Sequence, residues 1–198
     1  MKCLPESFYL SNNVVQISQL LLGKVLETKI NNKTTSGIIV ETEAYSGQND
    51  KASHSYKNKK TQRNSAMFEN GGHTYIYLCY GIHALFNVVT NIKEIPQAVL
   101  IRSIEPVKGA QHMLKRRGMK KISTHLTSGP GKLCQALGIS LQHNKVSLQG
   151  PNISIYDSGI TISRSSIIAC PRIGVDYAGK DALKPWRFYI KSNPWRSK

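Results

Sequence analysis

The stretch KVLETKINNKTTSGIIVETEAY, residues 24–45, decides the fold of this chain. Its two halves are rich in β-branched residues, and the Asn-Asn-Lys between them is typical of a tight turn. The pattern therefore predicts two antiparallel strands joined as a β-hairpin at residues 31–33.

The rest of the chain adds more strands than helices. Helical spacing begins near residue 13, where Ser11, Asn12 or Asn13 could each cap the helix. The other expected helices are 107–118 and 128–139, and the other expected strands are 73–89, interrupted at Tyr80-Gly81, then 97–105, 157–175 and 185–192. We expect an α+β fold, a single compact domain over 1–198 with a curved, mostly antiparallel β-sheet and surrounding helices.

The charge of the chain points to a polyanionic partner. It carries 27 Lys and Arg against 11 Asp and Glu, a formal net charge of +16. Residues 107–156 contain no acid but eight basic residues, half of that net charge. A lysine-rich solvated surface is the plain alternative, but so long an acid-free span favours contacts with nucleic acid phosphates.

Other classes of protein are less compatible with the sequence. The start has no basic segment followed by a long apolar one, and no apolar run is long enough to cross a bilayer, so we expect a cytoplasmic protein without membrane contact. The four cysteines lie far apart, without a CxxC pair or a histidine at ligand spacing. We therefore expect reduced thiols, no metal and no cofactor.

Two carboxylates stand at the end of the hairpin. Side chains two apart on a strand point the same way, which places Glu41, Glu43 and Tyr45 on one face together with Ile39. The alternate residues in 38–44 are small and mostly apolar, as the core requires. Carboxylates about 6.5 to 7 Å apart along a strand also approach the spacing of an inverting glycosidase pair. A glycosidase is the weaker hypothesis, because binding of a neutral sugar polymer would not explain the net charge of +16.

Aromatic residues accompany these acids. Tyr75 and Tyr77 share a face of their strand, while Tyr80 precedes Gly81 at a hairpin tip. Each tyrosine alone could be an ordinary strand residue with its hydroxyl in water. Carboxylates beside aromatic rings on a basic surface are harder to explain in that way.

The same residues resemble the alkyladenine (3-methyladenine) DNA glycosylases of the mammalian type. The similarity includes ETEAY (41–45), YGIH (80–83) followed by Asn87, SGPGKLCQALGI (128–139) and RFYIKSNPW (187–195). These and the intervening matches cover nearly the whole chain in the family's order. The resemblance implies a monofunctional DNA glycosylase of base excision repair, a monomer that acts on double-stranded DNA containing damaged purines. Its place would be the nucleoid if the source is bacterial.

The resemblance also implies roles for residues near the hairpin. Glu43, and not Glu41, matches the general base that activates a water, and Arg102 matches the arginine that helps to hold this water. Tyr45 and His54 match residues on one side of a flipped base, and Tyr77 the residue on the other side.

Further roles concern selectivity and DNA contact. Asn87 matches a side chain that crowds the exocyclic amine of guanine, and Tyr80 matches the wedge that fills the gap in the duplex. Thr61, Arg63 and Lys132 are expected to contact phosphates. Glu41 could instead form a structural salt bridge, and His73 and His112 have no role that the resemblance supplies.

Some features depart from the family pattern. The chain lacks the long N-terminal extension of the mammalian members, reads TQRN (61–64) in place of TPRN, and has His83 in place of a tyrosine. The main alternative is a non-catalytic basic module that binds nucleic acid on the same fold. Glu43 separates the two hypotheses, because a binding module gains nothing from a carboxylate that faces phosphates.

Overall fold

The predicted hairpin forms and lies within the central sheet of the computed structural model, which describes residues 1–197. β2 (Val25–Ile30) pairs with β3 (Lys33–Tyr45), and Asn31 and Asn32 make the turn between them. Their φ angles are 52° and 57°. Two consecutive residues with positive φ are the geometry of a type I′ turn, which matches the twist of paired strands and suits asparagine.

All strand pairs of the sheet are antiparallel. Seven strands follow one another in the order β1-β7-β2-β3-β6-β5-β4, and β9 pairs with both β3 and β8. The remaining strands are β1 (Lys2–Cys3), β4 (Thr74–Cys79), β5 (His83–Thr90), β6 (Gln97–Lys108), β7 (Ile153–Asp157), β8 (Ile167–Cys170) and β9 (Arg187–Ile190).

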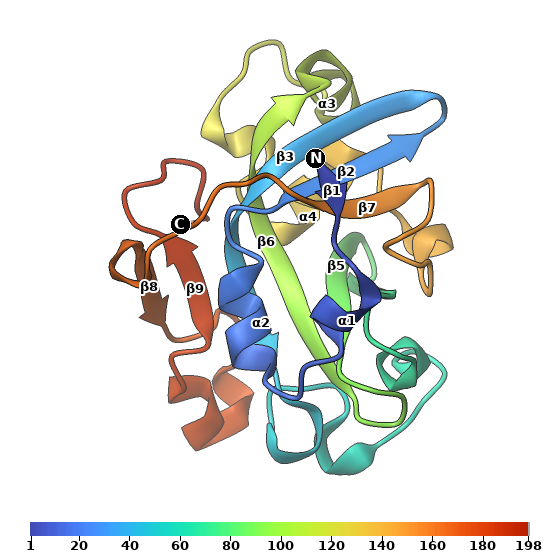
Figure 1. Ribbon diagram of the computed structural model, residues 1–198, viewed down its shortest axis with the longest axis vertical. Coiled ribbons are helices and arrows are strands. Elements are labelled where there is room, and N and C mark those ends of the chain that lie inside the picture. Colours follow the sequence, from blue (N-terminus) through green and yellow to red (C-terminus); the bar gives the residue numbers. More distant parts are fainter. Residues whose placement is uncertain (198) are drawn as a thin grey trace.

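Short helices surround this sheet, so the fold is α+β as expected. Figure 1 shows the two N-terminal helices in front of the sheet and β8 and β9 at its side. The α-helices are α1 (Glu6–Tyr9), α2 (Val14–Leu20), α3 (Ala110–Arg117) and α4 (Pro130–Leu137). The 3₁₀ helices are η1 (Gly47–Asn49), η2 (Tyr56–Asn58), η3 (Ser65–Phe68), η4 (Thr124–Leu126), η5 (Leu141–His143), η6 (Arg164–Ser166) and η7 (Asp176–Leu183).

Helix α2 begins where the sequence predicts. Of the three possible caps, Asn13 is the one that acts, because its side-chain oxygen accepts a hydrogen bond of 3.0 Å from the Gln16 N–H. Ile17 and Leu21 then enter the main core beside Phe86 and Ile104 of the sheet. The helix thus covers apolar sheet surface that would otherwise meet water.

The faces of β3 differ in one respect from simple alternation. The pairing of β3 with β6 shifts register between Ile39 and Glu41 and again between Glu41 and Thr42. As a result, Ile39 joins Ala44 in the main core and does not share the face of the two glutamates. The prediction for Ile39 was wrong because an irregularity in a strand interrupts the two-residue period.

Other differences lie near the ends of the sheet. The sequence pattern did not indicate β1 or β7, two short strands that complete one edge beside β2. The expected strand over 157–175 is shorter, and only Ile167–Cys170 is extended and paired. The expected helix over 107–118 starts at Ala110, because β6 continues through Lys108.

Two general features of the described residues complete this description. The helices within 1–197 all lack the length and apolar character needed to cross a membrane. The four cysteines carry free thiols, and burial raises the pKa of the Cys134 thiol, so this side chain remains a neutral part of the core.

Candidate active site

Glu41 and Glu43 of β3 face one cation, Arg102 of β6. Arg102 lies 3.2 Å from Glu41, from Nε to Oε1, and 3.1 Å from Glu43, from Nη1 to Oε1. Neither glutamate has exposed surface. Burial alone would lower the pKa of Arg102, but the two carboxylates outweigh it and hold this pKa above the ordinary value. The guanidinium therefore stays charged.

Glu43 receives two further hydrogen bonds. The Tyr45 hydroxyl donates to Oε2 at 2.8 Å, and the Ile173 N–H donates to Oε1 at 2.9 Å. Burial, followed by the charge of Glu43, raises the pKa of Tyr45 well above its usual value, so the phenol keeps its proton. The two donors thus engage both oxygens of the carboxylate.

Glu41 has a different set of partners. Besides Arg102, its carboxylate accepts from Arg187 Nη1 at 3.0 Å and from the Ser197 hydroxyl at 2.8 Å and N–H at 2.6 Å. The structural salt bridge considered for Glu41 is therefore present, with two arginines. Because both carboxylates face the same arginine and these donors surround Glu41, the pair cannot flank a bond as two glycosidase acids do.

An aromatic cavity of about 410 Å³ opens beside Glu43. It brings together most of the predicted site residues: Tyr45, His54, Arg63, Tyr77, Tyr80, Asn87 and Arg102. Glu43 itself is not among the lining residues. Its two hydrogen-bond donors, Tyr45 and Ile173, and its ion-pair partner Arg102 all line the cavity, so the carboxylate lies directly behind this wall.

One wall of the cavity is built from three aromatic rings in mutual contact, His54, Tyr75 and Tyr77. His54 Nδ1 lies 2.8 Å from the Tyr75 hydroxyl, and the His54 ring meets Tyr77 edge to face with centroids 4.6 Å apart. Loss of water contact in this packing lowers the pKa of His54 to about 4, and the positive charge of Arg63 acts in the same direction. The imidazole is therefore neutral near pH 7.

The other predicted cavity residues are held by the backbone. The Asn87 amide is buried and donates to the carbonyls of Tyr75 and Leu85 at 3.0 and 3.4 Å, which fixes its orientation. Arg63 Nη2 donates to the Leu78 carbonyl at 3.1 Å, and its guanidinium lies 5.1 Å from the centre of the Tyr77 ring. Both side chains are thus placed by β4 and β5.

Tyr80 lies at the tip of the β4–β5 hairpin, as expected. Its side chain is 92% exposed, and neighbouring Ile82 is 73% exposed. The φ angle of Tyr80 is 51°, a left-handed conformation that is uncommon for a residue with a bulky side chain. The hairpin therefore holds an aromatic ring in water at the edge of the cavity.

A second cavity of about 740 Å³ adjoins the first and shares Tyr80 and Arg102 with it. Lys132 lies here, beside the start of α4, while Thr61 lies in neither cavity and bonds to Asn64 instead. None of the described lining residues is acidic, and several are basic or titratable: His83, Arg102, Arg117, His125, Lys132 and Arg196. The groove can therefore accept an anionic chain.

Several residues of the site were not among those predicted. The sequence pattern places Tyr75 on the same face as Tyr77 but gives it no role, and the structure packs the two rings together. The sequence pattern did not indicate Ile173, Arg172 or Ser197, since they reach the site from loops after β8 and after β9. Within residues 1–197 no group of three His, Cys, Asp or Glu side chains is placed to hold a metal ion.

Known proteins similar to this chain are DNA glycosylases. The model of the methylpurine-DNA glycosylase family matches residues 7–194. A protein of Chlamydia felis named "Putative 3-methyladenine DNA glycosylase" is 52% identical over 188 residues, which is 94% of this chain and 95% of that protein. A protein of Chlamydia pneumoniae with the same name is 50% identical, and the match covers 94% of each chain. A protein of Bacillus cereus with this name is 44% identical, and the match covers 98% of each chain.

A match over nearly the whole chain, together with relatives of this identity, settles the relationship. The resemblance inferred from ETEAY, YGIH and RFY is confirmed, and so is the class of enzyme expected from it. The chain belongs to the methylpurine-DNA glycosylase family, and it is a DNA glycosylase, an N-glycosyl hydrolase.

Proposed function

We propose that this enzyme flips an alkylated or deaminated purine nucleotide out of duplex DNA and hydrolyses its N-glycosidic bond with a water activated by Glu43. The observation that carries the proposal is the placement of the Glu43 carboxylate. It lies behind the wall of an aromatic cavity, paired with the Arg102 guanidinium and hydrogen-bonded to Tyr45 and Ile173. A carboxylate at this place is the group that general base catalysis of water attack requires.

The chemistry requires one such base. As the bond between C1′ and the purine nitrogen breaks, its electron pair leaves with the purine and positive charge develops on the sugar. The carboxylate stabilises this charge, and it accepts the proton of the water whose oxygen bonds to C1′. Arg102, which forms an ion pair with Glu43 and lines the cavity, would hold that water.

The cavity suits a planar base. Tyr45 and His54 would lie on one side of it and Tyr77 on the other, an arrangement that favours electron-poor alkylated purines. A base stacked between two rings needs them about 7 Å apart, because carbon atoms in contact lie about 3.5 Å apart. The His54 and Tyr77 centroids are only 4.6 Å apart, so entry of the base must displace the imidazole.

Selectivity would come from two sources. Flipping costs least for a damaged or mispaired base, so the lesion itself contributes. Asn87, with its amide fixed by two carbonyls, would crowd the exocyclic amine of an undamaged guanine. Both effects reject normal purines before chemistry begins.

The DNA contacts follow from charge and exposure. Tyr80 would enter the duplex as the wedge, and Arg63, Lys132 and the more distant Thr61 would bind phosphates without reading sequence. A monomer would be the active form. In a bacterium its substrate would place it at the nucleoid.

The test is a set of duplexes that each carry one defined purine lesion. Release of free base by the wild-type protein, and its loss with Glu43→Gln while lesion binding persists, is the expected result. Binding of all duplexes without release of any base would instead support the non-catalytic module.

A further inference from the structure

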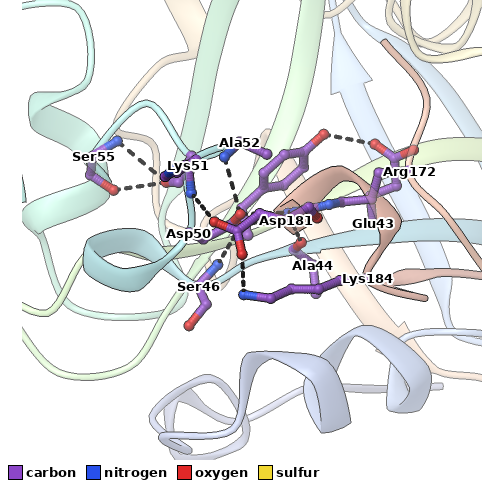
Figure 2. A network of polar contacts seen from close by, with 12 residues as sticks. Glu43, Ala44, Ser46, Asp50, Lys51, Ala52, Ser55, Arg172, Asp181 and Lys184 are labelled. Carbon is purple, nitrogen blue, oxygen red and sulfur yellow. Dashed lines mark hydrogen bonds and ion pairs between the residues drawn. The ribbon is translucent and has the colours of Figure 1, made fainter. Parts of the chain in front are cut away.

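A buried ion pair lies beside the candidate active site. Arg172 donates to Asp50 through both terminal nitrogens, at 2.5 and 2.8 Å, and neither side chain has exposed surface. Burial alone would lower the pKa of Arg172, but its hydrogen bonds and attraction to Asp50 raise it. The guanidinium of Arg172 therefore stays charged inside the protein. Figure 2 shows this network next to Glu43.

The pair joins three separate segments of the chain. Arg172 also donates to the carbonyl of Ala44 at the end of β3, at 2.9 Å, and to that of Asp181 in η7, at 3.0 Å. Asp50 accepts from the N–H groups of Ser46 and Ala52, at 3.2 and 3.1 Å. The loop that leads to His54 and the loop that follows β8 are thus fixed to the strand that carries Glu43.

Both hydrogen-bond donors to Glu43 depend on this arginine. Ile173, whose N–H bonds to Oε1, is the next residue in the chain after Arg172. Tyr45, whose hydroxyl bonds to Oε2, has its ring centre 4.9 Å from the Arg172 guanidinium. A fixed Arg172 therefore holds the Ile173 N–H in place through the peptide chain. It holds the Tyr45 hydroxyl in place through contact with the tyrosine ring.

We propose that Asp50 and Arg172 are positioning residues for base excision, which hold Ile173 and Tyr45 so that their donors point at the Glu43 carboxylate. The inference rests on the proposed role of Glu43 as the base. Neither residue touches the substrate in this scheme, and both act only through the geometry of Glu43.

Stability alone does not account for the pair. The desolvation of two buried charges offsets most of their attraction, and apolar residues often replace such pairs without loss of stability. Arg172 Nε is also buried without an acceptor among the described residues, which adds to the unfavourable side. The contacts of Arg172 beside Glu43 therefore explain better than stability why an arginine is present.

The experiment compares three variants: Arg172→Lys, Asp50→Asn, and a double variant that carries both Asp50→Asn and Arg172→Met. The double variant leaves no unpaired charge. Lysine keeps the cation but cannot donate in the bidentate manner of arginine. Single-turnover release of base, affinity for lesion duplex and melting temperature are measured for each. We expect the excision rate to fall by up to about 100-fold in the double variant, the loss that a small misplacement causes, with affinity little changed.

The pH profile separates positioning from a merely structural role. Loss of donors disfavours the ionised carboxylate, so the acid limb of the rate profile should move to higher pH. The titratable or charged groups around Glu43 are Glu41, Tyr45, Tyr77, Arg102, Cys170 and Arg172. Tyr45→Phe removes one donor directly and should move the same limb in the same direction.

Arg116→Lys is the matched control, because Arg116 bonds to Thr35 and to the Ala136 carbonyl away from the cavity. It should leave the excision rate per folded molecule and the pH profile unchanged. A double variant that folds, binds and excises with the wild-type profile would overturn the inference. If that variant does not fold, Arg172→Lys and Asp50→Asn decide by the same criteria. Excision that survives Glu43→Gln would instead show that the proposed base is wrong.

Discussion

The carboxylates of Glu41 and Glu43 share the guanidinium of Arg102, but the rest of their surroundings differ. Glu41 accepts from Arg187 and from the hydroxyl and N–H of Ser197, while Glu43 accepts from Tyr45 and Ile173 at the wall of the aromatic cavity. Two acids on one face of β3 thus have different surroundings. Glu41 holds the arginine, and our proposal assigns the chemistry to Glu43 beside the cavity.

This difference predicts unequal effects of neutral substitutions. Glu43→Gln should abolish excision and leave affinity for lesion duplex nearly intact, because the carboxylate acts on water. Glu41→Gln should mainly lower stability, since breaking a buried ion pair typically costs about 3 to 5 kcal/mol. Single-turnover excision, gel-shift binding and melting temperature on both variants check this, and equal losses of excision per folded molecule would contradict a single base.

Substitution of Tyr80 should affect lesion processing and not stability. The ring is 92% exposed, so Tyr80→Ser removes no packing from the fold. It should weaken binding and excision on paired lesions, while the melting temperature and binding to undamaged duplex change little. Tyr80→Phe keeps the ring and serves as the control. A clear fall in melting temperature with normal excision per folded molecule would end the wedge assignment, since truncation of a buried aromatic costs about 3 to 5 kcal/mol.

Affinity for undamaged duplex should fall steeply with salt. The expected log–log slope is about −0.9 per phosphate contacted, as counterions are released from DNA. Lys132→Gln should flatten the slope by about one contact. Lys29→Gln, an exposed substitution on β2, should not. A slope near zero for the wild-type protein would show that the charge of +16 serves something other than DNA.

His54 should titrate far below an ordinary histidine. Because its pKa is lowered to about 4, the unfolded chain binds more protons than the folded protein between about pH 6.5 and 4. The contribution of His54 to stability is therefore complete above this window and is lost as the pH falls through it. NMR titration of the imidazole should give a midpoint near 4, and Arg63→Gln should raise it. A midpoint near 6.5 would show that the ring is not packed against Tyr75 and Tyr77.

The proposed mechanism uses water and no lysine nucleophile or metal. Chelators should leave excision unchanged, and borohydride should not trap a covalent complex between enzyme and DNA. Activity assays with a chelator and denaturing gels after borohydride treatment provide the measurements. A trapped Schiff base or recovery of activity by added zinc would require a different mechanism.

The sequence predicts the parts of the site that lie on regular strands. Period-two alternation and hairpin turns place Glu43, Tyr45, Tyr77 and Tyr80, because strand geometry determines where such side chains point. The family resemblance adds Arg102, His54 and Asn87, which the structure gathers in the same cavity.

The parts supplied by irregular segments could not be predicted in the same way. Ser197 is 156 residues from Glu41 in the chain, and Arg172 is 122 residues from Asp50. No local pattern records such pairings, since they depend on the path of loops after β8 and β9. The register shift that moves Ile39 into the core is likewise a property of two strands together and not of β3 alone.

The register shift in β3 makes the length of this strand as consequential as its composition. Successive side chains of a strand point to opposite faces of the sheet. A deletion of one residue between Ile39 and Glu43 would therefore reverse the faces of one half of the strand relative to the other. Either Ile39 would leave the core or Glu43 would turn away from Arg102. An ideal strand with the same residues would point Glu43 to the opposite face of the sheet. A graft of this hairpin onto another scaffold must therefore keep the irregular pairing with β6.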